Sequence, residues 1–222
     1  MRRCRDALQK LPYGDLRQFT TTIAMADADA VRRALGAHQV NLVGGSYGTR
    51  AALEYLRQFP QAVRRVVIDG VAPPDMVLPA SFSPDAQSAF DALLDSCEAD
   101  RACSARYPQL RAQWSGVLQG LPRTVTLQHP VTGRDETLTL TRDMLLGLVR
   151  LPLYMPLLTS ALPHAVFEAA RGHFVPLVGL GGAMAGGREA QIASGMHFSV
   201  VCAEDMPRLP ASSERPGADF GD

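Results

Sequence analysis

One short stretch, residues 40–49, constrains the fold of this chain more than any other. An apolar run over residues 40–43 predicts a buried strand, and it leads directly into a Gly-x-Ser-x-Gly pattern at Gly44, Ser46 and Gly48. A helical pattern begins at once after this motif. Glycines on both sides of a serine are expected where bulkier side chains would collide with the adjoining strand and helix. The stretch therefore predicts a sharp strand-to-helix turn that holds the Ser46 hydroxyl above a sheet.

The chemistry of such a turn makes Ser46 a candidate nucleophile. The turn holds the serine in a strained backbone conformation, and the following helix points its free N–H groups and positive dipole end at the reacting centre. The motif by itself is expected by chance in roughly one chain in fifteen of this length. The strand before it and the helix after it supply the context that the motif requires. The alternative is a glycine-rich turn with an inert serine.

The segments around the turn predict a parallel sheet. Residues 20–37 have the periodicity of a helix, which Thr22 can cap at its start and Gly36 can end. The helix after the turn stops at Pro60, and residues 63–68 form a second apolar run. A strand, a helix and a strand joined by short links form a right-handed βαβ unit. Catalytic groups in such sheets lie at the carboxyl ends of the strands, where Ser46 is expected.

The pattern changes after Pro74 and loses its strand–helix alternation. We therefore expect a partial core with the turn over residues 1–76, a mostly helical insertion over 77–195, and a return towards the core with a loose tail over 196–222. The elements expected are helices over 83–97 (begun by Ser83 and Pro84) and 110–118, a hairpin over 124–140, helices over 143–150 and 163–171, a flexible connection over 179–187, a short strand over 198–203 and a loose tail over 210–222.

Composition excludes several classes of function. Basic and acidic residues number 22 each, so nothing indicates nucleic acid or an anionic membrane as a partner. No apolar run approaches the ~20 residues of a membrane span.

Cys97 and Cys103 flank a short polar loop, which favours a local disulfide over a zinc site. A disulfide implies an oxidising compartment, although the N-terminal residues carry no export signal.

Three stretches together resemble one family. These are Asp27–Gly36 leading to Gly44–Arg50, then Val67–Pro74, and finally Ser199–Asp205. They are similar to the tripeptidyl-aminopeptidase-like branch of the α/β-hydrolases, relatives of the prolyl aminopeptidases. The resemblance implies a partial α/β-hydrolase fold, with the nucleophile elbow on a parallel sheet and a mostly helical cap. It also implies a secreted or periplasmic serine exopeptidase that acts on free amino ends of peptides, without metal or cofactor.

The resemblance assigns roles to individual residues and also shows departures. Ser46 matches the nucleophile, and the backbone N–H of Tyr47 matches one oxyanion donor. Members of the family also have a His-Gly-Gly-Pro-Gly-type loop before the elbow, and a triad Asp and His after the cap. Neither is found in this sequence, so we expect an internal piece of a longer enzyme. In that case Cys4 and Cys202 would lack their natural partners.

No general base can be assigned from the sequence. Asp69 follows the second strand, which is early for a triad acid, and a turn-capping role is favoured. Each histidine is favoured as an ordinary surface or core residue; these are His38, His129, His164, His173 and His197.

Glu204 and Asp205 are candidate ligands for the substrate's ammonium group. They follow the apolar run at the point where the cap should return to the core, and a carboxylate held near the serine makes a strong charge-assisted hydrogen bond. The alternative is that they cap a turn before Pro207. An aminopeptidase is the favoured function. An esterase or lipase-like hydrolase, and a non-catalytic hydrolase-fold protein without a triad, are the competing functions.

Overall fold

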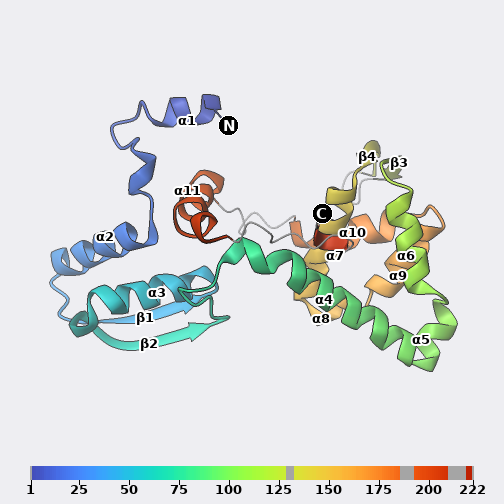
Figure 1. Cartoon of the computed structure of the whole chain (residues 1–222), viewed down its shortest axis with the longest axis horizontal. Helices are drawn as coiled ribbons and strands as arrows, with labels where there is room; N and C mark the ends of the chain where they lie inside the picture. Colours follow the sequence, from blue (N-terminus) through green and yellow to red (C-terminus); the bar gives the residue numbers. More distant parts are fainter. Residues whose placement is uncertain (1, 129–132, 186–192, 210–218, 222) are drawn as a thin grey trace. The chain divides into compact units, whose positions relative to one another are not determined.

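The structure, a computed structural model, describes residues 2–128, 133–185, 193–209 and 219–221 (Figure 1). It divides into two units. The elbow unit comprises Met1–Ser81 and Ile192–Ser213, and the helical unit comprises Phe82–Gln191 and Glu214–Asp222. In the described ranges, no helix combines the length and the apolar character that a bilayer crossing demands.

The elbow unit is built around two parallel strands. Its elements are α1 (Arg2–Leu8), η1 (Leu16–Gln18), α2 (Thr21–Ala34), β1 (Val40–Gly45), α3 (Tyr47–Gln58), η2 (Pro60–Ala62), β2 (Val63–Asp69), α11 (Ser194–Glu204) and η5 (Met206–Arg208). Strands β1 and β2 pair in parallel, with Gly45 opposite Asp69. Figure 1 shows α3 between α2 and the strands. The predicted strand–helix–strand unit is therefore present, with the elbow at the carboxyl end of β1.

Helix α2 has the predicted C-terminal signal and a different N-cap. Gly36 has a φ of 68°, and the amide of Ala37 donates to the Arg32 carbonyl in a Schellman arrangement. At the other end the capping side chain is that of Thr20, whose Oγ1 accepts from the Ile23 amide, and not that of Thr22. Three threonines in a row offer equivalent caps in sequence, so the choice depends on where the helix begins.

A buried carboxylate joins α2 to α3. Tyr55, only 3% exposed, donates its hydroxyl proton to Asp29 Oδ1 over 2.9 Å. Arg32 and Arg33 pair with the same carboxylate, over 2.7 and 3.1 Å. The hydrogen bond from Arg32 holds the pKa of Asp29 below its usual value, with Tyr55 acting in the same direction. This network fixes the helix that delivers the chain into β1.

The helical unit has its own core. Its elements are α4 (Leu78–Ala99, which begins in the elbow unit), α5 (Arg101–Arg106), α6 (Leu110–Gln119), the antiparallel hairpin of β3 (Arg123–Gln128) and β4 (Asp135–Leu140), α7 (Arg142–Arg150), η3 (Leu151–Tyr154), α8 (Pro156–Thr159), α9 (Leu162–Ala170), α10 (Val175–Ala185) and η6 (Asp219–Gly221). Phe90 and Trp114 meet edge to face at its centre, with ring centroids 5.0 Å apart. The predicted hairpin is thus present, and α7 and α9 are the helices predicted over residues 143–150 and 163–171.

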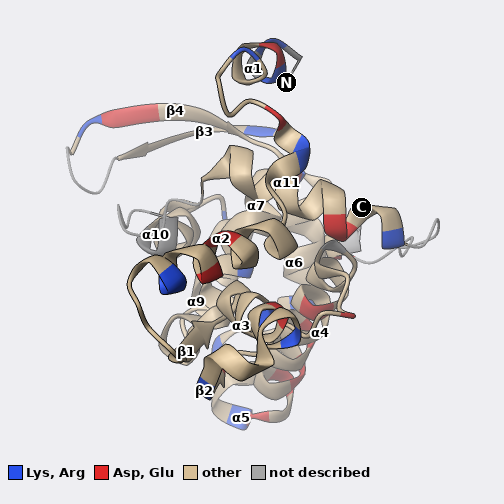
Figure 2. Cartoon of the chain, turned by 90° about the vertical axis from the view of Figure 1, so that its left-hand side faces the viewer, with Lys and Arg blue, Asp and Glu red and all other residues tan. Residues whose placement is uncertain are grey.

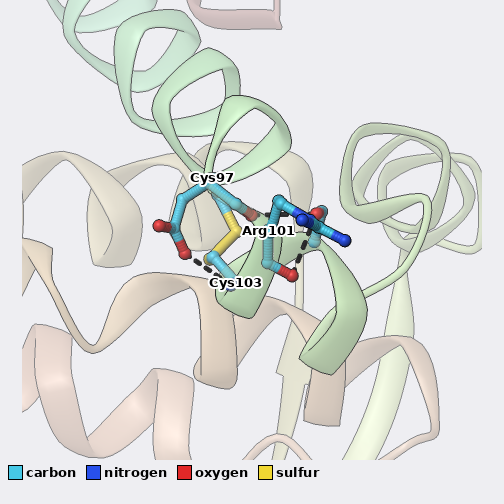
Figure 3. Close-up of a disulfide and its surroundings, with 5 residues drawn as sticks. Cys97, Arg101 and Cys103 are labelled. Carbon is cyan, nitrogen blue, oxygen red and sulfur yellow. Dashed lines mark hydrogen bonds between the residues drawn. A yellow bond between two sulfur atoms is a disulfide. The ribbon is translucent and has the colours of Figure 1, made fainter.

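Cys97 and Cys103 form a disulfide, the pairing that the sequence predicts (Figure 3). It joins the end of α4 to α5, whose first residue is Arg101. Asp100 caps α5, because its Oδ1 accepts from the Cys103 amide over 2.7 Å. Residues of both charge signs are interspersed along the ribbon in the view of Figure 2.

Besides the cap of α2, four local predictions are wrong. Helix α4 begins at Leu78, so Pro84 lies inside it instead of opening it. Residues 198–203 belong to α11, because a six-residue apolar run fits a helix as well as a strand. Residues 179–185 are helical in α10, and residues 186–187 lie outside the described part. A side chain at Gly181 would come within 2.8 Å of Leu148 Cα, so this glycine lets α10 pack closely on α7.

The fourth error concerns the tail. Phe220 is 7% exposed and packs into the core of the helical unit, where its ring contacts Phe90. Trp114 donates its indole N–H to Asp219 Oδ2 over 2.8 Å. An aromatic residue with a neighbouring acceptor thus orders residues 219–221. The expected loose tail is corrected for these residues, and residues 210–218 and 222 lie outside the described ranges.

Candidate active site

Ser46 has the backbone conformation of a strained turn. Its φ and ψ are 52° and −124°, in a region that non-glycine residues rarely occupy. Its amide donates to the Asp69 carbonyl over 3.0 Å, which extends the β1–β2 pairing by one bond. Its carbonyl accepts from Thr49 Oγ1 over 2.7 Å, at the start of α3. Strand pairing and the first turn of the helix thus hold Ser46 in this conformation, in which the residue is exposed to solvent.

The two glycines of the motif differ in what surrounds them. A Cβ at Gly44 would lie 2.6 Å from the carbonyl carbon of Gly48, nearer still to its oxygen, and 2.9 Å from the Thr49 nitrogen. A Cβ at Gly48 would meet no described atom within 4 Å. The predicted steric need for glycine is therefore confirmed at Gly44. At Gly48 it is not supported within the described residues.

Tyr47 begins α3, directly after Ser46. The first N–H groups of a helix have no partner within the helix, so the Tyr47 amide is available as a donor beside the serine. The Tyr47 hydroxyl lies 2.6 Å from Thr21 Oγ1 at the start of α2. The side chain that follows the candidate nucleophile is therefore held by a neighbouring helix.

Arg50 lies in the first turn of α3 and is 3% exposed. It pairs with Asp205 through one nitrogen, with Nη1 3.0 and 3.1 Å from the two carboxylate oxygens. Its other terminal nitrogen donates to the Met76 carbonyl in the segment after β2. The same part of that segment is held by Thr49, whose Oγ1 accepts from the Ala72 amide over 2.8 Å. The first turn of α3 is thus tied to both the segment after β2 and the end of α11.

The structure gives the two predicted ammonium ligands partners within the protein. Asp205 is fully buried, and Arg208 also pairs with it, over 3.0 Å. A buried carboxylate already paired with two guanidinium groups does not present a free face to a substrate ammonium, so we correct this prediction for Asp205. Glu204 is half-buried, and its two oxygens accept from the amide and the hydroxyl of Thr21, over 2.5 and 2.9 Å.

No described side chain forms a hydrogen bond with Ser46 Oγ. The described residues therefore identify no general base, and the sequence also assigned none. Asp69 is exposed at the end of β2, and its carbonyl is used by the Ser46 amide. In the elbow unit, His38 follows α2, and His197 lies in α11 against the ring of Phe198.

The other candidate histidines lie elsewhere. His164 is in α9 of the helical unit, where its ring faces Tyr107. His173 follows α9 and pairs with Glu168 over 2.9 Å, which lowers the pKa of that carboxyl group. His129 falls outside the described residues. Among the residues that are described, no group of three or more His, Cys, Asp or Glu side chains could hold a metal ion.

Comparison with known proteins places this geometry in a family. Residues 12–127 match the family model described as alpha/beta hydrolase fold. This stretch is about half of the chain and includes the elbow and both parallel strands, β1 and β2. The chain belongs to the α/β-hydrolase fold family.

Three relatives show what this hydrolase-fold chain is similar to. It is 38% identical over 73 residues to "Serine protease Hip1" of Mycobacterium tuberculosis, which covers 33% of this chain and 14% of the relative. It is 30% identical over 142 residues to "Putative hydrolase YuaR" of Escherichia coli, covering 59% and 28%. It is 42% identical over 59 residues to "Tripeptidyl aminopeptidase" of Streptomyces lividans, covering 27% and 11%. The matched stretches thus span about a tenth to under a third of the length of these relatives.

The buried ion pair that holds the first turn of α3 was not predicted from the sequence. Arg50 was part of the motif that carried the resemblance, but received no role. A signal was present, since an arginine four residues after Ser46 stands in a helix whose neighbouring positions are small or apolar. Such an arginine needs a buried carboxylate. Nothing in the sequence indicates that the carboxylate lies 155 residues further along the chain.

Proposed function

We propose that this chain carries the nucleophile of a serine hydrolase, and that the enzyme releases short peptides or single residues from the free amino ends of peptides. The observation that carries the proposal is Ser46, held at φ 52° between a parallel strand and the start of a helix. Strain of this kind costs about 1–3 kcal/mol and persists where the surroundings enforce it, typically at functional sites.

The assignment of substrate rests on similarity and chemistry together. Two of the relatives are named as a serine protease and a tripeptidyl aminopeptidase, and both match only part of this chain. The partner we propose is a peptide with a free amino terminus, with no cofactor required for the reaction. We also propose a secreted or periplasmic location, supported by the disulfide between Cys97 and Cys103, because such bonds persist in oxidising compartments.

The proposed reaction is acyl transfer through the serine. Ser46 Oγ attacks the carbonyl carbon of the scissile amide, and its proton passes to a general base. Negative charge then develops on the carbonyl oxygen, where the Tyr47 amide donates a hydrogen bond. The C–N bond breaks as the leaving amine takes up the proton, and water then hydrolyses the acyl-enzyme. The residues described here supply the nucleophile and one donor for the oxyanion.

The test is covalent labelling together with kinetics, on the protein expressed from its own gene. A fluorophosphonate probe should label Ser46, as read by mass spectrometry of the labelled peptide. Ser46→Ala should abolish labelling and lower kcat by about 10⁴- to 10⁶-fold, as nucleophile removal does in triad enzymes. Ser115→Ala, at an exposed serine of α6, is the matched control and should change neither. Hydrolysis that survives Ser46→Ala would overturn the proposal.

The choice of substrate distinguishes the alternatives. Peptide amides with a free amino end should be cleaved faster than their N-acetylated forms. Equal rates on both, with faster cleavage of simple esters, would indicate an esterase. Absence of turnover with every substrate and of labelling would indicate a non-catalytic hydrolase-fold protein.

A further inference from the structure

Two adjacent carboxylates at the end of α11 bind residues that flank the elbow. Glu204 is the last residue of α11 and Asp205 follows it. Glu204 reaches the residue after Ser46 through Thr21, and Asp205 reaches the first turn of α3 through Arg50. All of these residues belong to the elbow unit. One short segment is therefore linked to the elbow helix at two separate points, directly through Asp205 and indirectly through Thr21 for Glu204.

We propose that Glu204 and Asp205 are positioning residues for the nucleophile elbow. Glu204 fixes Tyr47, and with it the amide beside Ser46, while Asp205 fixes the first turn of α3. This inference rests on the proposed function, because positioning matters for rate only if Ser46 reacts. It differs from the role of an ammonium ligand, in which Glu204 would contact the substrate directly.

The direction of the Glu204 hydrogen bonds follows from the chemistry of the groups. A carboxylate only accepts, so Thr21 must donate its hydroxyl proton to Glu204 Oε2. The Thr21 oxygen is then the acceptor for the Tyr47 hydroxyl, which donates over 2.6 Å. The Thr21 amide donates to the other Glu204 oxygen at the positive end of α2. Tyr47 is thus the end of an ordered chain of donors that leads to a charge.

The Asp205 contacts are more deeply buried than those of Glu204. The side chains of Arg50 and Asp205 are 4% and 0% exposed, and the guanidinium group also reaches the Met76 carbonyl. Removing one partner leaves a buried charge without compensation, which strongly destabilises a fold. Substitutions at Asp205 therefore test folding before they test positioning. The Glu204 chain, which is partly accessible, offers the cleaner experiment.

The chain provides a matched pair of substitutions. Thr21 and Thr22 are neighbours in α2, and each donates a hydroxyl proton to a glutamate: Thr21 to Glu204 and Thr22 to Glu54, both over 2.9 Å. Thr21→Val breaks the chain to Tyr47, and Thr22→Val breaks an exposed bond of the same kind. Tyr47→Phe removes only the terminal hydroxyl and leaves the Glu204 carboxylate in place.

The experiment measures kcat and KM for a free-amine peptide and for its N-acetylated or ester counterpart. Thr21→Val, Tyr47→Phe and Glu204→Gln should each lower kcat by about 10-fold, the value at which the usual ranges for hydrogen bonds to neutral and to charged groups meet. The loss should be equal on both substrates and leave KM unchanged. Tyr47→Phe combined with Glu204→Gln should be no worse than either alone. Thr22→Val should match the wild type.

Several results would overturn the inference. A loss confined to free-amine substrates in Glu204→Gln, with Tyr47→Phe unaffected, would make Glu204 the ammonium ligand. Additive losses would mean that the two residues act separately, and no loss would remove them from the elbow.

Hydrogen exchange of the peptide over residues 44–50 provides a readout that is independent of the reaction. Exchange should be faster in Thr21→Val and Tyr47→Phe than in Thr22→Val. If Ser46→Ala stays active, the proposed function fails, while unchanged exchange in these variants would refute the positioning role alone.

Discussion

Substituting Gly44 by alanine is the most direct test of why this elbow has its sequence. The new methyl group would point at the backbone of Gly48 and Thr49, with distances of 2.6 and 2.9 Å to their nearest carbon and nitrogen atoms. Ordinary contact between carbon atoms is about 3.5–4.0 Å. Because the obstacle is backbone, no side-chain rotation can relieve it, and β1 and α3 must separate by roughly 1 Å.

The magnitude follows from what holds these elements together. Overpacking typically costs about 1–3 kcal/mol, and the upper end applies where neither side can yield. Here β1 is paired with β2, and the first turn of α3 is held by the ion pair of Arg50. We therefore expect Gly44→Ala to lower the free energy of unfolding by about 3 kcal/mol. For a chain of this length that corresponds to a fall in Tm of about 6–12 °C.

Gly48→Ala is the control within the same motif. Its Cβ meets no described atom, and alanine is favoured over glycine within helices by up to about 1 kcal/mol. Its Tm should therefore equal or exceed that of the wild type. Thermal unfolding followed by circular dichroism, with urea titration of the same samples, measures both variants. Equal stability of Gly44→Ala and Gly48→Ala would refute the steric explanation.

Three further predictions concern stability. Ser46→Gly should abolish activity yet raise the free energy of unfolding by about 1 kcal/mol in urea titrations, because relief of backbone strain outweighs the added chain entropy; a destabilised variant would mean that the serine is unstrained. The double substitution Cys97→Ser with Cys103→Ser should lower the free energy of unfolding by about 2 kcal/mol, because it opens a loop closed across six residues. Reduction of the wild type should lower its free energy of unfolding by the same amount. Because the pKa of Asp29 is lowered in the fold by Arg32, the contribution of this carboxylate to stability is complete above about pH 5 and is lost as the pH falls through that lower pKa. The stability difference between wild type and Asp29→Asn should therefore be present at pH 6 and shrink towards pH 2.

The parts of the fold that could be predicted are those that local sequence determines. The elbow, the two parallel strands and the Gly36 terminus each depend on residues within a few positions of one another. Thr20, and not Thr22, caps α2, and α11 replaces an expected strand, because neighbouring threonines and a short apolar run fit more than one register or element.

The contacts behind the elbow could not be predicted, because they join distant parts of the chain. Arg50 and Asp205 are separated by 155 positions, and Glu204 and Thr21 by 183. The sequence therefore identified Glu204 and Asp205 as acidic residues near the site, and assigned them to the substrate. Their partners within the fold become visible only when α11 is placed beside α2 and α3.

The separation of Arg50 from Asp205 also has a consequence for synthesis on the ribosome. The elbow unit is discontinuous, so its first 81 residues are made before residues 82–191 of the helical unit, and α11 is made after that stretch. At about 5–20 residues per second, Asp205 follows Arg50 by roughly 8–30 s. Throughout that interval the guanidinium of Arg50 must remain in water or find a temporary partner, since its carboxylate has not been made. The nascent elbow therefore cannot reach its final packing until translation has passed residues 82–191 of the helical unit.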